Sequence, residues 1–159
     1  MYGTKGSSLF RINPLSVNLD SLKSAFINVL LDVKTISNNG ILSDDLPYNT
    51  IYYPKRKKLY IVDTDDYFFS DMDSTSLYAS NKSQVENSLK IFLVDGYFDG
   101  IVRDNKYLYD LYRYGDFITF LKEYRYLLSE MSSKEIVSLK DAISCVDKEN
   151  RGSYVRLLK

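Results

Sequence analysis

The chain has 159 residues, which fits about one domain at roughly 100–200 residues each and leaves no room for separate cofactor and substrate domains. Hydrophobic residues make up 45% and charged residues 26%, a composition typical of a globular protein with a packed core. The 21 basic residues balance the 21 acidic ones, so no bulk positive field exists to attract nucleic acid or an anionic membrane. We therefore expect neither as a partner.

The absence of histidine and the single cysteine restrict the chemistry that the chain can perform. With no His and only Cys145, it has no usual zinc ligand set, no Ser-His-Asp or Cys-His nucleophile and no internal disulfide. Residues 1–14 contain no apolar run like that of a signal peptide, and residues 25–31, interrupted by Asn28, are far shorter than the ~20 residues that cross a bilayer. We therefore predict a cytoplasmic protein.

The first predicted elements are a looped or extended segment over residues 1–17 and a long helix over residues 18–39. Glycine, serine and proline interrupt the first segment, whereas apolar residues recur every three or four positions in the second. Asn18 is a suitable N-cap, and Gly40 is a suitable stop signal. This helix is the clearest local prediction.

A β-hairpin is predicted after the long helix. Residues 50–53 and 59–62 are rich in β-branched and aromatic side chains, and the basic segment 54–58 separates them. Residues 66–82 are polar and are predicted to form a loop.

The remaining chain is predicted to form a helical subdomain over residues 83–159. Capping-box patterns begin at Ser83 and Ser132, and Asp116 is suited to cap a helix over residues 117–131. Residues 107–114 also have a helical period. The predicted fold class is thus mainly α with a small antiparallel β-hairpin.

Asp44, Asn49 and Asp63 form the most informative constellation in the sequence. Asp44 and Asn49 precede the predicted hairpin, and Asp63 follows it. Because a hairpin returns the chain to within one strand spacing of its start, we expect the two carboxylates and the amide to converge. Oxygen ligands of this kind suit Mg²⁺, which binds one or two carboxylates and completes its shell with water and phosphate.

At these positions the sequence resembles the C-terminal lobe of the protein-kinase-like phosphotransferase superfamily. The family pattern H-R-D-x-x-x-x-N followed by D-F-G is similar to Leu42-Ser43-Asp44, Asn49 and Asp63-Thr64-Asp65. The order of long helix, loop, hairpin, second loop and further helices extends the resemblance over nearly the whole chain. It implies one kinase-like C-lobe over residues 1–159, with 1–17 resembling the interlobe hinge and 41–65 holding the catalytic loop, hairpin and metal loop.

The resemblance also implies roles for the three residues. Asp44 would be the catalytic base that orients or deprotonates the acceptor hydroxyl, and Asn49 and Asp63 would hold Mg²⁺ on the phosphates of ATP. The implied activity is that of an ATP-dependent kinase acting on a protein or on a small molecule.

The sequence departs from the family pattern in ways that leave the substrate class open. Leu42 replaces the usual His, Leu46 replaces the Lys of protein kinases, Asp65 replaces the Gly of D-F-G, and no Ala-Pro-Glu motif follows. These features resemble small-molecule members such as aminoglycoside and choline phosphotransferases.

A complete N-lobe would need roughly 70 residues, from about five strands, one helix and their connections. Only about 18 residues precede the predicted long helix. We therefore expect an N-lobe or partner chain to cover the exposed lobe face, and we expect the chain alone to bind ATP weakly and to have little activity.

Three function classes are consistent with the sequence. The first is a truncated or partial kinase, and the second is a non-catalytic, pseudokinase-like interaction module. The third is an unrelated helical binding domain in which the Asp residues only cap helices and turns.

Overall fold

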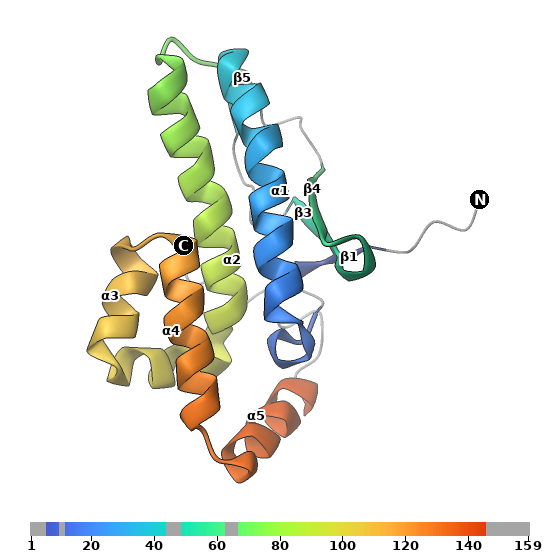
Figure 1. Cartoon of the computed structure of the whole chain (residues 1–159), viewed down its shortest axis with the longest axis vertical. Coiled ribbons are helices and arrows are strands. Elements are labelled where there is room, and N and C mark those ends of the chain that lie inside the picture. The colour runs from blue at the N-terminus through green and yellow to red at the C-terminus, as the bar shows by residue number, and fades with distance from the viewer. Residues whose placement is uncertain (1–5, 10–11, 44–48, 63–66, 146–159) are drawn as a thin grey trace, which may run out of the picture. The chain divides into compact units, whose positions relative to one another are not determined.

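The computed structural model of the protein describes residues 6–9, 12–43, 49–62 and 67–145 (Figure 1). The chain divides into two compact units. The first unit comprises Met1–Leu9 and Asp20–Ser88, and the second comprises Phe10–Leu19 and Leu89–Lys159. The single kinase-like lobe inferred from the sequence stays a prediction.

The long helix predicted over residues 18–39 is confirmed as α1, Leu19–Asn38. Its buried side chains recur every three or four residues and form the apolar stripe expected from the sequence. The chain leaves the helix at Gly40, whose φ of 73° lies in the left-handed region that glycine adopts at little cost. The Gly40 N–H donates to the Ser37 carbonyl oxygen at 3.0 Å, so Gly40 ends the helix as predicted.

The predicted hairpin is also confirmed. Strand β3, Thr50–Tyr53, pairs antiparallel with β4, Lys58–Ile61, and its tip is a 3-10 turn over Pro54–Arg56. Tyr52 lies opposite Leu59, and both side chains are buried in the core of the first unit. The hairpin therefore packs one face inward, as alternating strands do.

Two further strand pairings were not predicted. Strand β1, Ser7–Ser8, pairs antiparallel with β3 and makes a sheet in the order β1-β3-β4. Strands β2, Ile41–Leu42, and β5, Phe68–Phe69, form a separate antiparallel pair. Strands of two residues are too short to show an alternating pattern, so they leave no signal in the sequence.

Residues 66–82 do not form the predicted loop, because they contain β5 and the start of helix α2, Ser74–Asp104. The predicted start at Ser83 is therefore wrong. The Asp73 carboxylate accepts hydrogen bonds from the N–H groups of Thr75 and Ser76, both at 3.0 Å, and so caps the helix ten residues before Ser83. Helical geometry is interrupted once, at Asp95, where φ is 9° and ψ is 145°.

The second unit is helical, as predicted. Helix α3, Lys106–Tyr114, helix α4, Phe117–Glu130, and helix α5, Ser133–Cys145, lie close to their predicted ranges. Asp116 caps α4, and Ser132 caps α5 through a reciprocal pair of hydrogen bonds with Glu135. The core contains apolar side chains from three helices: Phe92, Leu93, Phe98, Leu108, Phe117, Phe120 and Tyr124.

The fold is thus mainly helical with small antiparallel sheets, which confirms the coarse fold class. None of the helices in the described part of the chain combines the length and apolar character that a membrane crossing requires.

Candidate functional site

The two segments that contain Asp44 and Asp63 are flanked by paired strands at both ends. Strand β2 precedes residues 44–48 and β3 follows them, while β4 precedes residues 63–66 and β5 follows those. Leu42 of β2 lies opposite Phe68 of β5, and Thr50 of β3 lies opposite Ile61 of β4. The strand pairs therefore join the beginning of each segment to the end of the other.

Asn49 extends the β3–β4 pairing by one hydrogen bond. The Val62 N–H donates to the Asn49 carbonyl oxygen at 2.7 Å, so Asn49 lies beside the residue that precedes Asp63. Asp44 and Asp63 themselves lie outside the described residues, and their predicted roles stay predictions. Within the residues that the structure does describe, no group of three or more Asp, Glu or Cys side chains could hold a metal ion.

Ser43, the residue before Asp44, is held by a buried side chain from α2. Asn81 is fully buried, and its Oδ1 accepts hydrogen bonds from the Ser43 N–H at 2.9 Å and the Ser43 hydroxyl at 2.8 Å. Its Nδ2 donates to the Ile41 carbonyl at 2.9 Å and to the Ser37 hydroxyl oxygen at 3.0 Å. All four hydrogen-bonding positions of this amide are thus used.

Gln84, one turn further along α2, completes the attachment of Ser43. Its Nε2 donates to the Ser43 carbonyl oxygen at 2.6 Å. Both backbone polar groups of Ser43 are therefore bonded to α2 side chains, which fixes the strand that leads into residues 44–48. Sequence reasoning missed these residues, although a polar Asn81 between Leu77 and Val85 on one helical face was a possible signal.

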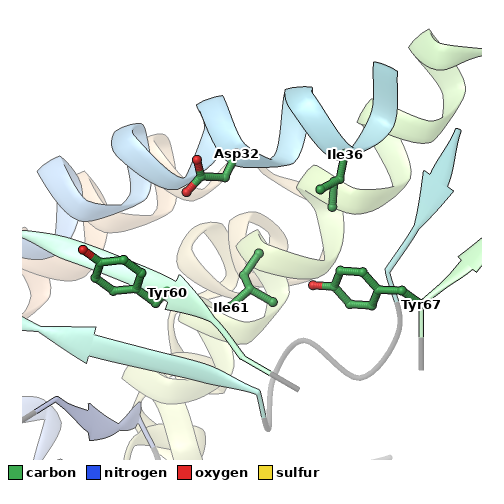
Figure 2. Close-up of a pocket in the computed structure, with 5 residues that line it drawn as sticks. All are labelled: Asp32, Ile36, Tyr60, Ile61 and Tyr67. Atoms are coloured by element: carbon green, nitrogen blue, oxygen red, sulfur yellow. The ribbon is translucent and has the colours of Figure 1, made fainter. Parts of the chain in front are cut away.

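A pocket of about 220 Å³ lies in the first unit between α1 and β4 (Figure 2). We call it the α1–β4 pocket, and it is lined by Asp32, Ile36, Tyr60, Ile61 and Tyr67. Asp32 and Ile36 lie one turn apart on α1, whereas Tyr60 and Ile61 are neighbours on β4. Because the lining residues come from distant parts of the sequence, no local motif predicted this pocket.

Tyr67 gives the α1–β4 pocket its most unusual polar group. Its hydroxyl is directed toward Ile61 (Figure 2), is itself buried and has no hydrogen-bond partner among the described residues. Burial raises the pKa of Tyr67 to about 12. The hydroxyl is therefore protonated at neutral pH and can both donate and accept a hydrogen bond.

No protein-family model matches the chain, and neither a curated protein nor a solved structure matches it. The interpretation of the site therefore rests on the sequence pattern and on the geometry described above.

Proposed function

We propose that the chain is the C-terminal lobe of a kinase-like phosphotransferase that transfers phosphate from ATP to an acceptor hydroxyl. Asp44 would orient the hydroxyl, and Asn49 and Asp63 would bind Mg²⁺ on the nucleotide phosphates. The acceptor class, protein or small molecule, is left open by the proposal.

The observation that carries the proposal is the paired flanks of the two acidic segments. The motif resemblance requires the segment with Asp44 and the segment with Asp63 to work together across one hairpin. The β2–β5 and β3–β4 pairings, extended by the hydrogen bond between Val62 and Asn49, support this requirement. The attachment of Ser43 to α2 supports it further, since a residue that positions an acceptor needs a fixed backbone.

The donor set is chemically suited to magnesium. The Asp63 carboxylate and the Asn49 side-chain amide offer the hard oxygen ligands that Mg²⁺ prefers, and water and phosphate would supply the rest. When bound, the ion would neutralise charge on the transferring phosphate. The protein residues would contribute the positions of these oxygens and the orientation of the acceptor.

The proposal is tested by thermal unfolding of the parent chain and Asp63→Asn with and without Mg²⁺ at low ionic strength. A ligand present at ten times its Kd stabilises the folded state by about 1.4 kcal/mol, so Mg²⁺ should raise the unfolding temperature of the parent. The rise should be smaller in Asp63→Asn and unchanged in Asp71→Asn, a matched control in the exposed segment after β5. Equal responses in the parent and Asp63→Asn would contradict the magnesium site.

A second readout addresses Asn49 directly. Paramagnetic Mn²⁺ bound near Asn49 should broaden the NMR signals of its side-chain amide, and Asp63→Asn should restore them. If this broadening persists in Asp63→Asn, the two residues do not share a metal ion.

A further inference from the structure

The α1–β4 pocket combines one carboxylate with aromatic and aliphatic walls. Asp32 takes part in none of the ion pairs found in the described part of the chain, which join Lys82 to Glu86, Arg103 to Asp99 and Lys106 to Asp110. Its negative charge is therefore not balanced by a neighbouring basic side chain there. The aliphatic side chains of Ile36 and Ile61 and the rings of Tyr60 and Tyr67 are the other described residues of the lining.

Each of these groups favours the same kind of ligand. A carboxylate attracts a cation, and the faces of tyrosine rings attract cations through their quadrupole. The two isoleucines and the Tyr67 ring can contact an apolar body. An anion would be repelled by Asp32, and a neutral molecule would leave that carboxylate without an opposite charge.

We propose that the α1–β4 pocket is a binding site for a small organic cation, consisting of a primary ammonium group on a short apolar body. The ammonium group would lie at the Asp32 carboxylate, and the body would extend along Ile36 and Ile61 towards the Tyr67 ring. With a volume of about 220 Å³, the pocket is smaller than the roughly 300–1,000 Å³ of drug-sized sites, which limits the ligand to a few carbon atoms.

This site is independent of the phosphotransfer proposal. Asn49 is not among its described lining residues, and these residues supply one carboxylate for a bare divalent metal ion. Asp32→Asn should therefore leave the Mg²⁺ response of the chain unchanged, so the two proposals can fail separately.

The test uses three probes of similar shape and different charge: n-butylammonium, n-butanol and butyrate, compared at matched ionic strength. Binding is followed by NMR through the methyl signals of Ile36 and Ile61. We expect saturable shifts of both residues with n-butylammonium, weaker binding of n-butanol and none of butyrate. Equal affinities for the charged and neutral probes, or shifts confined to other methyl groups, would overturn the proposal.

Variants assign the interaction to its side chains. Asp32→Asn should weaken n-butylammonium binding by about three- to fivefold, as expected for an exposed ion pair, whereas Tyr67→Phe, which keeps the ring, should leave it unchanged. Asp71→Asn and Tyr78→Phe are the matched controls and should bind as the parent does. Asp32 is exposed on α1, so its replacement should leave the fold intact. Unchanged affinity in Asp32→Asn would refute the role of its charge.

Discussion

At the scale of single residues, Asn81 is the side chain on which the backbone around Ser43 depends most. Replacing it with alanine removes four hydrogen bonds and leaves the Ser43 N–H and the Ile41 carbonyl oxygen without this partner. Because unpaired buried polar groups cost about 1–3 kcal/mol each, we expect Asn81→Ala to lower the free energy of unfolding by about 2–4 kcal/mol. Urea unfolding measures this difference.

Asn87 provides the matched control for Asn81. It lies on the same helix and is exposed, so Asn87→Ala should change the free energy of unfolding by less than about 0.5 kcal/mol. Similar effects of the two substitutions would show that the Asn81 hydrogen bonds add no stability beyond helix propensity.

At the scale of elements, the cap of α4 links helix stability to pH. The Asp116 carboxylate accepts hydrogen bonds from the Thr119 hydroxyl at 2.7 Å and from the Thr119 N–H at 3.0 Å, which lower the pKa of Asp116 below its ordinary value. A lowered pKa in the folded state gives stability that is present above the ordinary pKa and is lost as the pH falls through the folded pKa.

We therefore expect Asp116→Ala to reduce the free energy of unfolding by about 1 kcal/mol at neutral pH. The difference from the parent should shrink in acid, where the parent carboxyl is protonated. Asp116→Asn should keep most of the stability, because Asn is also a good N-cap and does not titrate. Urea unfolding over a series of pH values checks both points, and a constant difference for Asp116→Ala would contradict them.

The elements that could be predicted from the sequence are those whose ends are set by residues within one turn of the backbone groups that they cap. Gly40 after α1, Asp116 before α4 and the Ser132–Glu135 capping box act on neighbouring backbone groups, so their positions could be inferred locally. The start of α2 was missed because its inward face contains Asn81, a polar residue whose burial depends on partners about 40 positions away.

The candidate site could likewise be predicted only where local sequence determines the structure. The hairpin that brings Asn49 beside Val62 followed from two β-prone runs and a polar turn, whereas the β2–β5 pairing depends on contacts between distant dipeptides. The α1–β4 pocket could not be predicted, because Asp32 and Tyr67 come to line one pocket only through the packing of α1 against the hairpin region.

At the scale of the whole molecule, the proposed function requires more than these 159 residues contain. Phosphoryl transfer depends chiefly on positioning and charge stabilisation. Asp44, Asn49 and Asp63 would hold the metal ion and orient the acceptor, but they do not replace the lobe that covers the nucleotide. We expect the purified chain to hydrolyse ATP, or to transfer its terminal phosphate, at no more than background rates. If the chain turns over ATP in a Mg²⁺-dependent reaction that Asp63→Ala abolishes, the chain is sufficient for phosphotransfer by itself.

The tip of the hairpin has a consequence for how a protease would attack the chain. Lys55, Arg56, Lys57 and Lys58 are consecutive and exposed, a sequence that trypsin readily cleaves when it is extended. Here the tip is closed: Lys57 has a left-handed backbone, with φ of 49°, and the Asn28 side-chain amide donates to its carbonyl oxygen at 3.1 Å.

Trypsin should therefore cut the folded chain at this tip slowly, and Asn28→Ala should accelerate the cut severalfold while the exposed Asn38→Ala does not. Mass spectrometry of timed digests identifies the bond that breaks first, and equal rates in the two variants would mean that the Asn28 hydrogen bond does not restrain the tip. The rate of cleavage then serves as a label-free measure of how firmly α1 restrains the hairpin.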